Sequence, residues 1–139
     1  MEYLTELYHY VAEKKGRTII KRLEIAKVLL TGPKAQILAD TLSHPNCAIT
    51  DLVINRCRAK SEKMGLIFTA LANNNSVANL TLRDTNIPRD SLMDLVDMLG
   101  ANRSLQMLTL LNAGLSDASV HILASGLEQS HGLIYLDLR

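Results

Sequence analysis

The feature that most constrains this chain is an apolar pattern that recurs at a nearly constant spacing. Each copy has an apolar residue, two variable residues, Leu, one variable residue, and then Leu or Ile. Copies beginning at Ile49, Val77, Leu105 and Leu133 follow one another at steps of 28 residues, and a copy beginning at Ile20 fits with a step of 29. Five copies at one period predict a solenoid, in which each repeat stacks on its neighbours.

Each copy predicts a short strand that is followed by a helix. The last three positions of the pattern alternate inward and outward, as a strand requires. After a polar or small-residue bend, apolar residues recur at spacings of three and four, which is typical of one buried helical stripe. The stripes are Met64, Ile67, Phe68 and Leu71; Leu92, Leu95, Val96 and Leu99; and Val120, Leu123 and Leu127. Pro33, Ser61 and Ser116 are residue types favoured where helices start.

A column of polar residues marks the point where each helix turns back into the next strand. Asn46, Asn74, Asn102 and Ser130 follow one another at steps of 28. Because asparagine tolerates the left-handed backbone, we expect these asparagines to adopt it. Asn74, Asn102 and Asn79 also begin glycosylation sequons. Two of these sequons recur with the repeat, so we interpret them as turn chemistry.

Residues 1–17 lie outside the period. Leu4, Leu7, Tyr8 and Val11 form one helical stripe, which Lys14, Lys15 and Gly16 close. We predict an N-terminal capping helix over residues 1–17, which covers the open end of the stack or completes a preceding repeat. Residues 18–139 then hold about four and a half repeats.

The last repeat stops at Arg139, directly after a strand and before the helix that would complete it. A truncated repeat leaves an unpaired strand edge and an apolar face. We therefore expect either that the chain is part of a larger protein or that it self-associates through this uncapped C-terminal strand.

The strand pattern, the helix in every repeat and the period of 28 or 29 resemble the ribonuclease-inhibitor type of leucine-rich repeat, which also occurs in NOD-like receptors and, more distantly, in tropomodulins. The resemblance covers residues 18–139. It implies an α/β fold: a right-handed solenoid with a parallel sheet on its concave face and helices on its convex face. One column departs from the family, which has Asn or Cys after the strand. Here the column reads Val28, Cys57, Thr85 and Ala113, so only Cys57 matches, although Thr85 keeps a hydroxyl that can hydrogen-bond.

Composition excludes several classes of partner and location. Fifteen basic and fourteen acidic residues leave a net charge of +1, which supplies no field for nucleic acid or an anionic membrane. The N-terminus carries acids where a signal peptide carries bases, and no apolar run approaches the roughly 18 residues of a membrane span. Cys47 and Cys57 are too few for a disulfide framework. We expect a cytoplasmic protein that binds neither nucleic acid nor membrane.

No arrangement of residues indicates catalysis, a cofactor or a metal. The four histidines have no partner that would form a hydrolytic triad, and we interpret them as surface residues. His44, Cys47 and Cys57 offer three metal ligands, but the fourth is missing and the spacing matches no zinc pattern. The segment 31–34 lacks the flanking residues of a phosphate-binding loop. We therefore predict a non-enzymatic protein without catalytic, cofactor-binding or metal sites.

The surface that remains is formed by the outward-facing columns of the strands. In a parallel sheet, equivalent side chains line up at intervals of about 4.8 Å and present one face. The early repeats contribute charges, and Met107, Leu111 and Tyr135 contribute apolar contact, a mixture that resembles binding hot spots. The candidate protein-binding residues are Arg22, Glu24, Asp51, Asn55, Arg56, Asn79, Arg83, Asp84, Met107, Thr109, Leu111, Tyr135 and Asp137.

The size of this face limits the affinity that it predicts. A sheet of this width gives a footprint of about 200 Å², well below the roughly 800 Å² per partner of a standard interface. The chain alone should bind weakly, unless loops, helices or further repeats add to the surface. We expect a protein-interaction module or scaffold within a larger intracellular protein. A structural or cytoskeleton-associated end-piece is the alternative.

Overall fold

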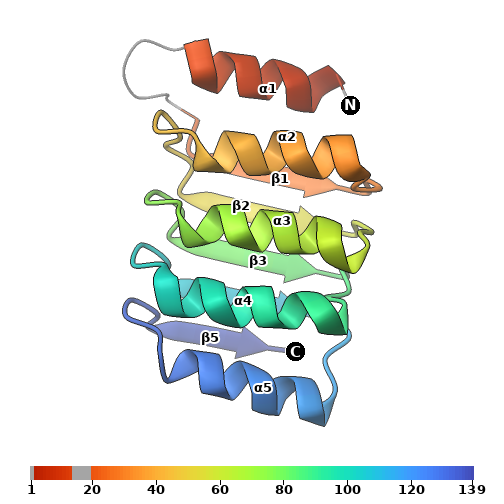
Figure 1. Cartoon of the computed structure of the whole chain (residues 1–139), viewed down its shortest axis with the longest axis vertical. Helices are drawn as coiled ribbons and strands as arrows, with labels where there is room; N and C mark the ends of the chain where they lie inside the picture. Colours follow the sequence, from red (N-terminus) through yellow and green to blue (C-terminus); the bar gives the residue numbers. More distant parts are fainter. Residues whose placement is uncertain (1, 14–19) are drawn as a thin grey trace.

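The computed structural model of this chain describes residues 2–13 and 20–139, in which helices and strands alternate (Figure 1). The helices are α1 (Glu2–Glu13), α2 (Gly32–Ser43), α3 (Ser61–Ala72), α4 (Arg89–Ala101) and α5 (Asp117–Leu127). The strands are β1 (Arg22–Ala26), β2 (Asp51–Asn55), β3 (Asn79–Arg83), β4 (Met107–Leu111) and β5 (Tyr135–Leu138).

The strands form one parallel sheet, in the order β1-β2-β3-β4-β5. Leu52 lies opposite Leu80, and Leu80 lies opposite Leu108, so the register of the sheet equals the period of the sequence. The helices stack as a second layer on one side of the sheet (Figure 1). The predicted solenoid of alternating strand and helix, with a parallel sheet, is therefore confirmed.

The core lies between the two layers and repeats with the same period. The inward-facing side chains of Ile54, Leu82 and Leu110 are at most 1% exposed, and Ile67 and Leu95 of the facing helices are fully buried. These five side chains are spaced by the repeat, so each layer of the core packs against the next. Burial of each such side chain contributes about 1.5–3 kcal/mol of hydrophobic free energy.

The predicted helical stripes are buried except toward the last repeat. Val96 is half-buried, and Val120 of α5 is 39% exposed although its stripe predicted burial. The reason is positional, because α5 packs against α4 and no further helix of the described chain covers its other side. The start predicted for the last helix agrees with the structure. The Ser116 hydroxyl accepts a hydrogen bond of 3.2 Å from the Ser119 N–H and caps α5.

The left-handed backbone predicted for the asparagine column is wrong. Among the described non-glycine residues, positive φ angles of 48–57° occur instead in the turns directly after β1, β2, β3 and β4. These residues are Lys27, Arg56, Asp84 and Asn112.

The asparagines hold their turns by side-chain hydrogen bonds. The Asn102 side-chain oxygen accepts from the N–H groups of Ser104 and Leu105 at 2.8 and 2.7 Å. Its side-chain nitrogen donates to the carbonyl oxygens of Leu71 and Asn74, at 2.7 and 3.0 Å, in the preceding repeat. One carboxamide therefore closes its own turn and ties that turn to the repeat before it.

The same contacts recur one repeat earlier. Asn74 accepts from the N–H groups of Ser76 and Val77 at 2.8 and 2.7 Å, and it donates to the Leu42 carbonyl oxygen at 2.8 Å. Asn74 and Asn102 are each 4% exposed. Their sequons are thus inaccessible in the folded chain, which agrees with their interpretation as turn chemistry.

Helix α1 connects to the stack through this column as well. The Asn46 side-chain nitrogen donates to the Val11 carbonyl oxygen at 3.2 Å, which repeats the bond that Asn74 makes to Leu42. Leu4 and Val11 are fully buried. Helix α1 therefore occupies the helix position of a repeat that precedes β1. The predicted helix end at residues 14–16 and the boundary between residues 17 and 18 lie outside the described residues, and the capping role stays a prediction.

In the column that follows the strands, Cys57 and Thr85 form hydrogen bonds between neighbouring repeats. The fully buried Thr85 hydroxyl accepts from the Cys57 N–H at 3.1 Å and donates to the Arg83 carbonyl oxygen at 2.9 Å. The predicted capacity of Thr85 to hydrogen-bond is confirmed. The Cys57 thiol lies 3.4 Å from the Ile25 carbonyl oxygen, and its burial raises its pKa above the ordinary value.

Candidate protein-binding surface

The register of the sheet brings the predicted binding residues onto one face. One row across the strands consists of Arg22, Asp51, Asn79, Met107 and Tyr135. A second row contains Glu24, Thr109 and Asp137, together with Val53 and Thr81. A third contains Asn55, Arg83 and Leu111, and Arg56 and Asp84 follow in the turns after their strands. All thirteen predicted residues thus lie on this face or at its edge.

The acidic side chains of this face are already paired within the chain. Glu24 lies 3.5 Å from Arg22, and Asp51 accepts a hydrogen bond from the Asn79 side chain. Asp137 lies 2.7 Å from Arg139, whose hydrogen bond lowers the pKa of the Asp137 carboxyl.

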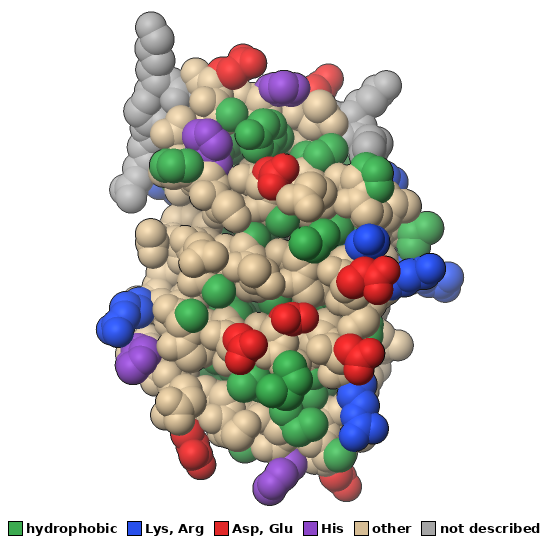
Figure 2. Space-filling model, in the orientation of Figure 1, with side chains coloured by type: hydrophobic (Ala, Val, Ile, Leu, Met, Phe, Trp, Pro, Cys, Tyr) green, Lys and Arg blue, Asp and Glu red, His purple; other side chains and the backbone are tan. Residues whose placement is uncertain are grey.

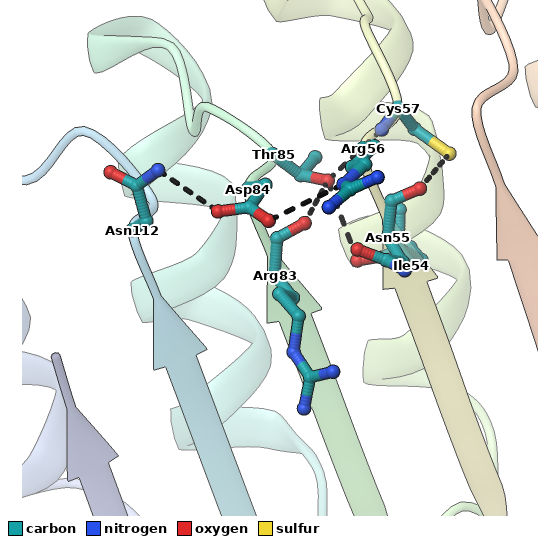
Figure 3. A network of polar contacts seen from close by, with 8 residues as sticks. All are labelled: Ile54, Asn55, Arg56, Cys57, Arg83, Asp84, Thr85 and Asn112. Atoms are coloured by element: carbon teal, nitrogen blue, oxygen red, sulfur yellow. Dashed lines mark hydrogen bonds and ion pairs between the residues drawn. The ribbon is translucent and has the colours of Figure 1, made fainter.

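The remaining acid, Asp84, joins two repeats in a polar ladder at the end of the strands (Figure 3). Its carboxylate lies 3.6 Å from the Arg56 guanidinium and accepts a hydrogen bond of 2.9 Å from the Asn112 side chain. These side chains are largely exposed, so the ion pair adds little stability, about 0–1 kcal/mol. Its effect is to hold the three side chains in a row.

Arg83 is the cation of this face that lacks an acid. Its guanidinium extends along β3, away from the polar ladder (Figure 3), and it has no ion pair among the residues that the structure describes. Its register partner Asn55 has a buried side-chain oxygen without a hydrogen-bond partner in the described chain. The exposed Arg83 guanidinium at the end of β3 is therefore available to an external partner, whereas the Asn55 oxygen is shielded from solvent.

Apolar side chains lie beside Arg83 on the C-terminal side of the sheet face. Met107 is 37% exposed and Tyr135 is 49% exposed, and the two are register partners. Leu111, the register partner of Arg83, is half-buried. The face thus combines one free arginine with aromatic and aliphatic surface, which is the composition of interface hot spots.

The sequence predicts no catalytic or metal-binding role for His44 and Cys47, and in the structure both side chains contact residues of the turns between helices and strands. His44 is half-buried rather than a surface residue, and its Nδ1 accepts from the Asn46 N–H at 3.1 Å. The Cys47 thiol is buried beside the side chains of Asn74 and Ser76. Within residues 2–13 and 20–139, no three His, Cys, Asp or Glu side chains form a metal-binding group. Both residues support the turn between α2 and β2.

Sequence reasoning missed the charge at the edge where strands lead into helices. The net charge of +1 averages over the chain, whereas segments 27–34 and 56–63 alone carry +2 and +3. The equivalent segments 84–91 and 112–119 each carry −1. Counting charge by repeat and by edge, rather than over the whole chain, would have revealed this difference.

Comparisons with known proteins agree with the fold. The chain matches no protein-family model. It is 31% identical over 120 residues to the Bos taurus protein named NACHT, LRR and PYD domains-containing protein 5, and 27% identical over 120 residues to the Mus musculus protein of that name. Each match covers 86% of this chain. The chain is a leucine-rich-repeat protein.

The leucine-rich-repeat chain spans only about a tenth of these relatives, 11% of the bovine and 10% of the murine protein. The similarity therefore concerns the repeats, and it does not transfer the activity of a whole relative. No helix within the described ranges is both long enough and apolar enough to cross a bilayer.

Proposed function

We propose that this chain is a non-enzymatic, cytoplasmic protein-binding module that contacts its partner through the concave face of the sheet. The observation that carries the proposal is the pairing pattern of that face. Its acids accept hydrogen bonds or form ion pairs within the chain, whereas the exposed Arg83 guanidinium has no ion pair among the described residues. A partner that supplies an acceptor, such as a carboxylate, to Arg83 would complete the pairing of this face.

The rigidity of the face favours recognition. The strands are joined in register, and the polar ladder Arg56, Asp84 and Asn112 links neighbouring repeats. A face that is ordered before binding loses little conformational entropy when a partner docks. The small footprint predicted from the sequence nevertheless limits the affinity of the sheet alone.

A site-specific photo-cross-linking experiment in cells tests the proposal. A photo-cross-linking amino acid replaces Tyr135 on the sheet in one variant and Met93 on the outer face of α4 in another. The two residues are a matched pair, because they are 49% and 52% exposed. We expect a discrete protein adduct from position 135 and none from position 93. In addition, Arg83→Ala should reduce the yield at position 135.

Equal adducts from both positions, or adducts from position 93 alone, would contradict binding through the sheet. An adduct at position 135 that Arg83→Ala leaves unchanged would contradict the role assigned to the free guanidinium. Circular dichroism of each variant serves as the control for folding.

A further inference from the structure

A second charged surface lies along the edge where β1 and β2 lead into α2 and α3. The loops 27–34 and 56–63 carry six of the fifteen cations of the chain, and Figure 2 shows Lys and Arg side chains gathered at this edge. We call these six residues the basic patch: Lys27, Lys34, Arg56, Arg58, Lys60 and Lys63. All six are exposed or half-buried, so their charges face solvent.

The backbone holds the two basic loops side by side. The Lys27 N–H donates to the Asn55 carbonyl oxygen at 2.9 Å, and the Arg58 N–H donates to the Val28 carbonyl oxygen at 3.1 Å. The Leu30 N–H then donates to the Arg58 carbonyl oxygen at 2.7 Å. The loops therefore continue the pairing of β1 with β2 beyond the ends of both strands. Like charges are fixed at short range, which raises the local positive potential.

Few acids of the described chain compensate this charge. Arg56 lies 3.6 Å from Asp84, and Lys63 lies 3.9 Å from Glu62. In the part of the chain that the structure describes, the other four cations of the basic patch form no ion pair. The positive ends of the α2 and α3 helix dipoles lie at the same edge, and neither helix has a side-chain cap. The patch thus attracts an anionic partner.

An apolar groove runs through the basic patch. Leu29 is 60% exposed, and it lines a cavity of about 410 Å³ together with Leu30 and Gly32. Lys60 and Lys63 also line it, together with Glu62, whose carboxylate lies 3.9 Å from the Lys63 amine. The Lys63 amine lies within van der Waals reach of Gly32, at 3.5 Å from the position of a Cβ there, so its ammonium stands beside the groove. A ligand that fills this site needs an apolar group flanked by negative charges.

We infer that the basic patch binds an acidic segment of a partner protein, in which an aliphatic side chain over Leu29 is flanked by carboxylates. This surface adjoins the sheet face of the proposed function and shares Arg56 with it, but it does not include Arg83. A nucleic acid fits less well, because its backbone offers no aliphatic group for Leu29. In addition, neither loop contains an aromatic residue on which bases could stack.

Fluorescence anisotropy with a labelled, end-capped peptide of the pattern Glu-Asp-Leu-Asp-Glu tests the inference. The matched control peptide is Gln-Asn-Leu-Asn-Gln. We expect binding of the acidic peptide that weakens with salt, and at least about tenfold weaker binding of the amide peptide. Equal binding of the two peptides would refute the role of the carboxylates.

Variants locate the site. Arg58→Glu and Lys60→Glu should each weaken peptide binding by about tenfold, because each places a like charge against the peptide. The control Arg103→Glu alters an exposed arginine at the opposite edge and should leave binding unchanged. Leu29→Ser should weaken binding several-fold, whereas Leu29→Met should retain it. If Arg58→Glu and Arg103→Glu behave alike, the basic patch is not the site.

Two further arms separate this inference from its competitors. A single-stranded oligonucleotide or anionic vesicles that bind more tightly than the peptide, with no effect of Leu29→Ser, would overturn the choice of a protein partner. Arg83→Gln should not affect the peptide. If it does, the peptide binds the sheet face and the inference fails while the proposed function stands. Failure of the peptide alone leaves the cross-linking result at Tyr135 intact.

Discussion

The two edges of the solenoid share one period but use it differently. At the helix-to-strand edge, buried asparagines close the turns through their side chains, as Asn74 and Asn102 show. At the strand-to-helix edge, exposed residues with a left-handed backbone follow each strand, and their side chains differ in charge from one repeat to the next. A turn that is closed by a side chain restricts the residue type, whereas a turn that is closed by the backbone leaves the side chain available for binding.

Main-chain hydrogen bonds account for the freedom of the strand-to-helix edge. The N–H groups of Lys27, Arg56 and Asp84 donate to carbonyl oxygens of the following repeat, each at 2.9 Å. These bonds do not depend on the side chain.

The largest loss of stability is expected at the helix-to-strand edge. Asn102→Ala removes two donated hydrogen bonds and two accepted from backbone N–H groups in a buried turn, and it leaves those backbone groups unpaired. We expect the free energy of unfolding, measured by urea titration, to fall by about 3 kcal/mol or more. The control Asn75→Ala alters an exposed asparagine at the same edge and should change it by less than about 0.5 kcal/mol. Similar changes in the free energy of unfolding for the two variants would contradict the role of the Asn102 side chain in closing its turn.

At the strand-to-helix edge, the buried hydroxyl of Thr85 acts in a comparable way. Thr85→Val leaves the Cys57 N–H without its acceptor, so we expect a loss of about 1–3 kcal/mol. Thr85→Ser keeps the hydroxyl and should lose less. The matched control is Thr109→Val, on the half-buried face of β4, which should be nearly neutral. A neutral Thr85→Val would show that the turn after β2 does not need the Thr85 hydroxyl as an acceptor.

At Lys27, whose backbone is left-handed, we expect the effect of a substitution on stability to depend on the backbone freedom of the new residue rather than on its charge. Its φ angle is 57°, which β-branched residues strongly disfavour. Lys27→Val should therefore cost about 1–2 kcal/mol, whereas Lys27→Gly should change stability by less than about 1 kcal/mol. Lys60 has a φ angle of −68°, so Lys60→Val is the control and should be tolerated. Equal costs at positions 27 and 60 would rule out a left-handed turn at Lys27.

The smallest effect concerns pH. Burial raises the pKa of the Cys57 thiol, so the folded chain keeps a proton that the unfolded chain releases above about pH 8.5. Unfolding then releases protons, and stability should decline as the pH rises through this range. Urea titrations at neutral and alkaline pH should show a smaller decline for Cys57→Ala than for the unaltered chain. An identical decline in both would assign it to other groups.

Much of the fold was predictable because the repeat period is also the register of the sheet. Ile54, Leu82 and Leu110 recur at 28 residues in the sequence and become neighbours across the strands. The same argument placed the predicted binding residues on one face. Whether that face binds a partner is a separate question, which no spacing answers.

The sequence by itself determined the period, the strand and helix faces and the positions of the turn residues, since a repeating core admits few arrangements of its apolar side chains. Only the tertiary structure decided how each turn closes, because the bonds of Asn102 reach carbonyl groups 28 and 31 residues away. It also decided which charges are paired and which stay free, as Asp84 and Arg83 show. Those outcomes depend on side-chain directions between stacked repeats, which a one-dimensional pattern does not contain.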